Sequence, residues 1–259
     1  MMLAQRALYL LPSYVIGIII IGFMVFLSIA GLYFVRRFIP HHKLKNHHDV
    51  ADPLLGILGA MYSVLLAFVV VTVWQNYDKA NAGVQKEAIY MADLYRDSEA
   101  LSLDFRQKLV PQLREYRQAL INYEWKTMQK GEGSLQAEKI MRSIWNLYTQ
   151  YTPKTQTELV FFNESVQKLN LFRELRRQRI MDSSNGIVPI LWVVLIIGAL
   201  SIISFTFLFG AENIKAQIVM GVLVSATIGL VLFTIVVLDF PFTGGVRITP
   251  EPFEKILLN

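Results

Sequence analysis

The sequence contains no cysteine. Disulfides, thiolate nucleophiles and Cys-based metal sites are therefore excluded. Charged residues are also scarce, at 17% of the chain against 54% hydrophobic residues, and they are missing altogether from four apolar stretches. A soluble protein of 259 residues could not hide four such stretches in one core. The scarcity of charge therefore points to a membrane.

The four apolar stretches contain no Asp, Glu, Lys, Arg or His. They run over residues 14–35, 54–74, 187–209 and 216–238. Each has the roughly 20 residues that a helix needs to cross ~30 Å of hydrocarbon. The sequence therefore predicts an all-α membrane protein with four transmembrane helices. The first pair lies in residues 1–75 and the second in residues 187–259, with residues 76–186 as a soluble insert between them.

The insert has the apolar spacing and the turn residues of a helical bundle. One helix is expected to continue from the second span to about Lys108 and to break before Pro111. Three more helices are expected over about residues 111–129, 134–151 and 155–182. Ser134 is a predicted N-cap. The first and last helices of this extramembrane bundle would then continue into the second and third spans.

The second span carries two faces of different chemistry. Small residues at helical spacing form one face, which lets a neighbouring helix approach closely. They are Gly56, Gly59, Ala60, Ser63 and Ala67. The nearly opposite stripe is expected to line a pore on the axis of an oligomer. Its residues are Tyr62, Leu65, Val69, Thr72 and Asn76.

In this interpretation Leu65 and Val69 form an apolar constriction, which can gate ions by dewetting. Tyr62 and the Thr72/Asn76 pair would be its polar mouths. The alternative is that the stripe meets lipid or the first span, with the Thr72 hydroxyl bonded to its own backbone. The sequence leaves both open.

The fourth span repeats the small-residue spacing and ends in a turn. Gly221, Ser225 and Gly229 are expected to pack against another helix. Two prolines and two glycines follow this span, so the chain is expected to close in an interfacial turn. Asp239 has two open roles: a structural lock with Arg247, or a ring of carboxylates that selects cations.

Arginines crowd the end of the last helix of the insert, before the third span. They are Arg173, Arg176, Arg177 and Arg179. They are expected to contact anionic lipid headgroups, at about 1 kcal/mol per residue near the surface. The alternative is a solvated helix face paired in part with Glu174.

Several classes of function are disfavoured. His41, His42, His47 and His48 gather in the loop after the first span, but their spacing fits no ligand pattern, so no metal is expected. The chain has no P-loop, dinucleotide fingerprint, zinc motif or triad, so neither an enzyme nor a cofactor is expected. No span has a charge at its centre, which disfavours ion-coupled transport. The net charge of +5 gives no case for nucleic acid.

Basic residues near the span ends indicate the orientation. An even number of spans puts both termini and the insert on one side of the bilayer. That side carries Arg6, Lys79, Lys86, Arg173, Arg176, Arg177, Arg179 and Arg247, against Arg36, Arg37, Lys43, Lys45 and Lys215 on the other. The larger number favours a cytoplasmic insert, although the smaller set lies in the short loops where the rule is strongest.

Several motifs of the chain resemble those of the bacterial bestrophin-like family of unknown function. The first are His47-His48-Asp49-Val50-Ala51, the run from Leu58 to Phe68, and Trp74. The next are Glu87-Ala88, Asp93-Leu94-Tyr95-Arg96, Phe205 to Gly210, and Glu212-Asn213. The last is Asp239-Phe240-Pro241-Phe242 with Gly244-Gly245 and Pro250-Glu251-Pro252-Phe253. The resemblance covers nearly the whole chain.

The family is named for a distant similarity to bestrophins, which are four-span, oligomeric, calcium-gated anion channels. The resemblance implies a homo-oligomer in a bacterial inner membrane that conducts inorganic ions, with a pentamer favoured and a tetramer possible. It also implies an apolar neck on the second span. The chain departs from bestrophins in lacking a run of acidic residues suited to a calcium clasp.

Two classes of function remain in competition. One is an ion channel around an axis of second spans. The other is a membrane scaffold or signalling partner, whose insert binds a soluble protein while the spans anchor it and form the oligomer. A channel needs a ring of second spans that encloses an axis, whereas a scaffold needs an exposed apolar or charged patch on the insert.

Overall fold

The computed structural model describes residues 12–38, 48–208 and 213–256. Within these ranges the chain is helical and contains no strand. Four helices of the described residues are long and apolar enough to cross a membrane. The predicted fold class, an all-α membrane protein with four spans and a helical insert, is confirmed.

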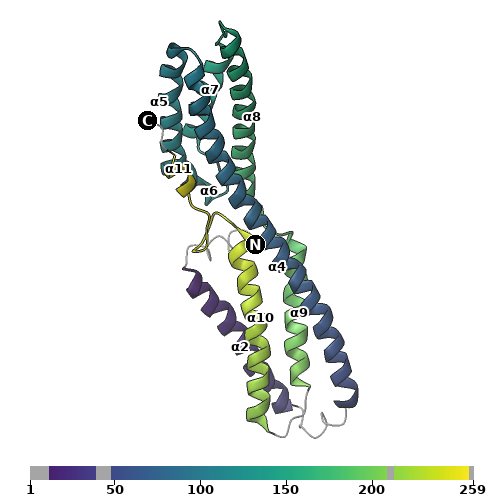
Figure 1. Cartoon of the computed structure of the whole chain (residues 1–259). Coiled ribbons are helices and arrows are strands. Elements are labelled where there is room, and N and C mark those ends of the chain that lie inside the picture. The colour runs from purple at the N-terminus through teal and green to yellow at the C-terminus, as the bar shows by residue number, and fades with distance from the viewer. Residues whose placement is uncertain (1–11, 39–47, 209–212, 257–259) are drawn as a thin grey trace. The chain divides into compact units, whose positions relative to one another are not determined.

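The four spans lie in helices α2, α4, α9 and α10 (Figure 1). Their bounds are Ser13–Phe38 for α2, His48–Asp97 for α4, Pro189–Phe207 for α9 and Ile214–Asp239 for α10. Helix α4 is the longest, at 50 residues, and no proline follows Pro53 within it.

The chain forms two compact units. The membrane unit holds the described residues up to Asn76, the described residues between 187 and 239, and residues 244–246. The insert unit holds residues 77–186 together with residues 240–243 and the described residues from Arg247 onward. The final segment therefore belongs to the insert, whereas the sequence interpretation grouped it with the second pair of spans.

Helices α2 and α10 pack side by side in the membrane unit (Figure 1). Small residues make this approach possible. A Cβ atom on Gly221 would come within 2.8 Å of the Ser28 hydroxyl, and one on Gly229 within 3.0 Å of the Ile21 Cα atom. Ser225 is fully buried in the same helix. Gly221, Ser225 and Gly229 thus lie where close helix packing needs small side chains.

The insert is a bundle of helices with its own apolar core. Its helices after α4 are α5 (Leu103–Ala119), α6 (Trp125–Met128), α7 (Leu135–Thr149) and α8 (Gln156–Ser184). A π-helical turn, Leu120–Glu124, joins α5 to α6. Ser134 caps α7 by accepting from the Ala137 N–H, so its predicted role as N-cap is confirmed.

The predicted break between Lys108 and Pro111 is wrong. Helix α4 ends at Asp97, a 3₁₀ turn follows over Ser98–Ala100, and α5 already begins at Leu103. The Ser102 hydroxyl accepts from the Phe105 N–H at 3.4 Å, which fixes the start of α5. Pro111 lies inside α5, where it costs the helix a backbone hydrogen bond.

The C-terminal segment packs into the insert. Phe242 and Phe253 are almost fully buried, and both rings contact Trp125 edge-on. The Trp125 indole N–H donates to the Ile248 carbonyl at 3.1 Å. These aromatic contacts explain why the segment belongs to the insert unit. Its one helix among the described residues is the short α11 (Glu251–Glu254).

Candidate functional site: the second-span helix and the buried charges of the insert

One face of α4 packs against the chain's own core in the membrane unit. Tyr62, Leu66, Val69 and Val73 are at most 8% exposed. The Tyr62 hydroxyl donates to the Leu195 carbonyl of α9 at 2.8 Å. The predicted pore-lining role of Tyr62 and Val69 is therefore wrong, because side chains that are buried within one chain cannot line a pore between chains.

A stripe of large side chains on another face of α4 is open. Leu58 is 39% exposed, Met61 68% and Phe68 69%. Leu65 is half-buried between them, while Thr72 and Asn76 are exposed further along. The three- and four-residue spacings place these residues in one row along a helix. We call Leu58, Met61, Leu65, Phe68, Thr72 and Asn76 the open stripe.

The hydroxyl of Thr72 donates to the Phe68 carbonyl at 2.8 Å. This bond is the local one that the alternative interpretation of the sequence foresaw. It leaves the oxygen of Thr72 as an acceptor on the open stripe. The pore-lining role of Leu65, Thr72 and Asn76 therefore remains a prediction.

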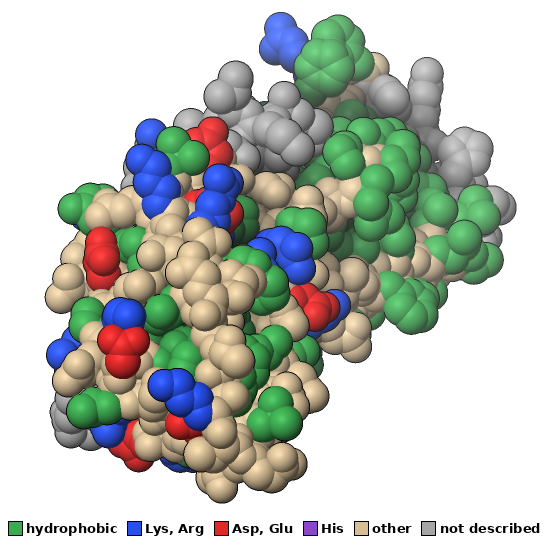
Figure 2. Space-filling model, turned by 90° about the horizontal axis from the view of Figure 1, so that it is seen from above, with side chains coloured by type: hydrophobic (Ala, Val, Ile, Leu, Met, Phe, Trp, Pro, Cys, Tyr) green, Lys and Arg blue, Asp and Glu red, His purple; other side chains and the backbone are tan. Residues whose placement is uncertain are grey.

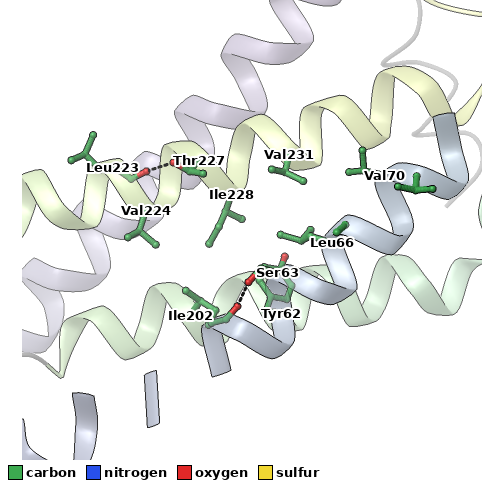
Figure 3. A pocket seen from close by; sticks show the side chains of 13 residues that line it. Tyr62, Ser63, Leu66, Val70, Ile202, Leu223, Val224, Thr227, Ile228 and Val231 are labelled. Carbon is green, nitrogen blue, oxygen red and sulfur yellow. Dashed lines mark hydrogen bonds between the residues drawn. The ribbon is translucent and has the colours of Figure 1, made fainter. Parts of the chain in front are cut away.

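The small-residue face of α4 borders a hollow of about 690 Å³ in the membrane unit. Gly59, Ser63 and Ala67 line it from α4, and side chains of α9 and α10, such as Ile202 and Thr227, line it from the other sides (Figure 3). A Cβ on Gly59 would meet no atom within 4 Å. No helix among the described residues covers this face, so its expected packing role, shared by Gly56 and Ala60, remains a prediction.

The hollow is apolar because its hydroxyl groups are already used. Ser63 donates to the Gly59 carbonyl, and Thr227 donates to the Leu223 carbonyl at 2.8 Å. Both bonds are marked in Figure 3. Such local bonds satisfy a hydroxyl donor without a partner from outside.

The arginines near the third span are not equivalent. Arg176 and Arg179 are 5% and 3% exposed, so their predicted contact with lipid headgroups is wrong. Arg173 lies over the Trp145 ring at 4.5 Å from its centre. Arg177 is exposed. For Arg173 and Arg177 the headgroup role remains a prediction.

The two buried arginines are held by carboxylates from other helices. Arg179 bonds both oxygens of Glu87, at 2.7 and 3.0 Å, and reaches Glu124 at 2.8 Å. Arg176 bonds Glu124 at 2.6 and 3.1 Å and also pairs with Glu138. We call these five side chains the buried ion network. It joins α4, the π-helical turn, α7 and α8 of the insert.

Burial and charge act in opposite directions on the carboxylates of this network. Burial alone would raise the pKa of Glu124, but Arg179 and Arg176 outweigh it and lower that pKa below its ordinary value. Glu138 behaves in the same way beside Arg176. For Glu87, burial raises the pKa and the attraction of Arg179 only partly offsets it. The network therefore depends on complete pairing of its charges.

The carboxylate of Asp239 binds the start of the third span. Its Oδ1 atom accepts from the Ile187 N–H at 2.7 Å, and the residue is 6% exposed. Arg247 is exposed in the insert unit. The lock between Asp239 and Arg247 and the carboxylate ring both remain predictions.

Gln217 is a polar residue that sequence reasoning missed. Its side-chain oxygen accepts from Arg36 Nε at 3.1 Å, and its nitrogen donates to the Thr206 carbonyl at 3.2 Å. It thus joins the ends of α2 and α9 to the start of α10. The available signal was an amide side chain placed within the first turn of an apolar helix.

The predicted histidine loop lies mostly outside the described residues, which exclude His41, His42 and His47. His48 is the first residue of α4. Among the described residues, no group of three or more His, Asp or Glu could hold a metal ion.

Solved structures share this fold. A bacterial bestrophin homologue from Klebsiella pneumoniae, in a single-substitution form, superposes with a TM-score of 0.68 at 13% identity, over 93% of this chain and 96% of that one. A second form of that protein gives 0.64 at 15% identity, over 92% and 93%. A structure described as a membrane protein gives 0.67 at 13% identity, over 92% and 95%. At these identities the likeness shows the fold.

The four apolar helices and the helical insert define an integral membrane protein. The sequence matches the Bestrophin-like domain over residues 22–253, which is most of its length. The chain therefore belongs to the Bestrophin-like family. A comparison with curated proteins gave no match.

Proposed function

We propose that the protein is a subunit of a homo-oligomeric ion channel, with a pore lined by the open stripe of α4. The observation that carries this proposal is the stripe itself. It leaves large apolar side chains uncovered on the helix whose other face is fixed to the chain's own core. Membership of the Bestrophin-like family agrees with a channel.

The chemistry of the stripe suits a gate. Leu58, Met61, Leu65 and Phe68 would form successive apolar rings when several copies surround an axis. Hydrophobic constrictions of this kind stop ions by dewetting, without a charged filter. Thr72 and Asn76 would supply the polar mouth on the side of the insert. The stripe carries no charged residue between Leu58 and Asn76.

The assembly is a homo-oligomer around this axis, with a pentamer favoured by the family resemblance and a tetramer as the alternative. The location is a bacterial inner membrane, with the insert on the cytoplasmic side. Permeant inorganic ions and lipid are the expected partners. Contacts between two different surface patches of neighbouring copies form a closed ring when the rotation from one copy to the next allows it. Such contacts would build the ring around this axis.

A scaffold is the second candidate, and exposed apolar residues of the insert favour it. Leu159, Val160 and Phe161 are consecutive residues of α8 and are 40–58% exposed. Elsewhere, the insert surface in Figure 2 mixes basic, acidic and apolar side chains. A partner protein that buries these three residues would be the scaffold's ligand.

Ion flux through the purified protein in liposomes tests the channel. Met61→Ala and Phe68→Ala should raise the flux or change its selectivity, because each widens an apolar ring. Phe26→Ala is the matched control, since Phe26 is 64% exposed on α2 and lies off the stripe. Flux that is absent from the native protein and from both stripe variants, in vesicles with confirmed oligomers, would contradict the proposal.

A further inference from the structure

A pocket lies within the insert, between α4 and α8. Its volume is about 180 Å³. The residues that line it are Lys79, Ala80, Ala82, Gly83, Lys86, Leu175, Gln178, Arg179 and Asp182. It is separate from the apolar hollow of the membrane unit and from the open stripe.

Gly83 creates much of this space. A Cβ atom on Gly83 would meet no other atom within 4 Å, so a glycine here leaves a gap between the two helices. A single water needs roughly 10–15 Å³ of such space, so the pocket has room for several water molecules. A single phosphate group or a small ester of it fits this room, whereas a nucleotide does not.

The charge available to a ligand comes from the two lysines of α4. Arg179 forms part of the wall, but its guanidinium is already bound to Glu87 and Glu124. Lys79 and Lys86 are exposed on α4, and the charge of Lys79 acts on the carboxylate of Asp182, where it opposes the rise that burial causes in the pKa of Asp182. Seven residues separate them, which is about 10 Å along a helix. Two flexible ammonium groups at this spacing can converge on one anion.

The opposite wall supplies a donor and one opposing charge. Gln178 donates from Nε2 to Asp182 Oδ1 at 2.7 Å, and its second N–H remains for a ligand. Asp182 is the one carboxylate among the lining residues. Among the lining residues other than Arg179, two lysines against this single carboxylate leave one net positive charge. That balance suits a ligand with one negative charge.

We propose that this pocket binds a phosphate group, with Lys79 and Lys86 as its cationic ligands and the Gln178 amide as a donor from α8. The group is either the phosphodiester of an anionic lipid headgroup or a small phosphate ester in solution. Lys79 follows Trp74, the end of the apolar run, by five residues, or about 8 Å of helix. That distance is comparable with the depth of a headgroup layer.

This site goes beyond the proposed channel and does not require it, because binding is measured without ion flux. The full-length protein, purified in a detergent without phosphate, is titrated by calorimetry with inorganic phosphate, glycerol phosphate and short-chain phosphatidylglycerol. At least one of these probes should bind. The K79Q/K86Q double variant should weaken that binding at least tenfold.

Two further variants separate a pocket from a diffuse charge effect. Gly83→Leu keeps both lysines and fills the gap, so it should also weaken binding, with Gly83→Ala as a milder substitution. Lys139→Gln is the control, because Lys139 is an exposed lysine of α7 away from the pocket. The affinity of the Lys139→Gln variant for the phosphate probes should equal that of the native protein.

The three probes distinguish the sources of the phosphate. Binding of glycerol phosphate or inorganic phosphate supports a soluble ester, and binding of the lipid alone supports a headgroup. The proposal is overturned if none of the three binds. It is also overturned if the double lysine variant binds as tightly as the native protein, or if Lys139→Gln weakens binding to the same extent.

Discussion

The guanidinium of Arg179 donates to both carboxylate oxygens of Glu87, with Nε 2.7 Å from Oε2 and Nη2 3.0 Å from Oε1. The two residues belong to α8 and α4 and are separated by 92 positions in the sequence. Both are buried, so the pair is shielded from salt and water. It therefore fixes one relative register of these two helices in the insert.

Removing one partner of this pair should be costly. Arg179→Met leaves Glu87 as a buried charge without its partner, and we expect a loss of about 3–5 kcal/mol in the free energy of unfolding. Arg177→Met, on the same helix but exposed, should change it by no more than about 0.5 kcal/mol. Chemical denaturation in detergent, followed by Trp fluorescence and circular dichroism, measures both. Equal losses in the two variants would show that the buried pair has no special role.

The stability of the insert should fall in acid, and Glu138 should contribute to that fall. Its pKa is lowered in the folded chain, so its stabilising effect is complete above the unfolded value near 4.3 and is lost as the pH drops through the folded value. Glu124 acts with the same sign. The pKa of Glu87 is raised in the folded chain, so protonation of Glu87 in acid favours the folded state and opposes this loss of stability.

The measurement is the melting temperature between pH 7 and pH 3. Glu138→Gln should lower it at pH 7 and should show a smaller further decrease in acid than the native chain, because this carboxylate can no longer be protonated. The comparison is Glu132→Gln, at an exposed residue near α7. An unchanged acid slope in Glu138→Gln would contradict the assignment.

Tyr62 and Gly198 should be coupled. A Cβ atom on Gly198 would collide with the Tyr62 ring, so Gly198→Ala overpacks the contact between α4 and α9 and should cost about 1–3 kcal/mol. The same substitution should cost much less in a Tyr62→Leu background, where the ring is gone. A double-mutant cycle of unfolding free energies in detergent gives the coupling. Additive effects would contradict the contact.

The sequence predicted the helices well because their signals are local. Span length and the absence of charge depend on one stretch of chain, and the cap at Ser134 depends on a few neighbouring residues. The predicted helix break before Pro111 is wrong, because the N-cap signal at Ser102 is stronger than the helix-breaking signal of Pro111. Ser102 offers an N-cap oxygen, while a proline can be accommodated inside a helix at the loss of one bond.

The faces of α4 could not be assigned in the same way. All sides of its membrane half are apolar, so periodicity separates the faces but does not tell which one the chain covers with its own α9. The hydrogen bond from Tyr62 to Leu195 decides this, and it joins residues 133 positions apart. The burial of Arg176 and Arg179 is equally non-local, since Glu87 and Glu124 come from distant segments.

Substitutions of Asp239 can distinguish two roles of its carboxylate: accepting the hydrogen bond from the N–H of Ile187, and contributing to a ring of carboxylates that selects cations. If its role is to hold the N–H of Ile187, Asp239→Asn keeps an acceptor oxygen there and should leave stability close to native. Asp239→Ala removes that acceptor and should cost about 1 kcal/mol, because the partly buried N–H of Ile187 loses its partner. Thermal unfolding of the two variants gives this difference.

Ion selectivity in liposomes gives the other half of the test. A ring of carboxylates at Asp239 would lose its preference for cations in Asp239→Asn and in Asp239→Ala alike, since both remove the charge. A residue that only holds the start of α9 would leave the selectivity of Asp239→Asn native. We expect the second result, because the carboxylate is 6% exposed and one of its oxygens already accepts a backbone hydrogen bond. Loss of cation preference in Asp239→Asn at unchanged stability would establish the ring instead.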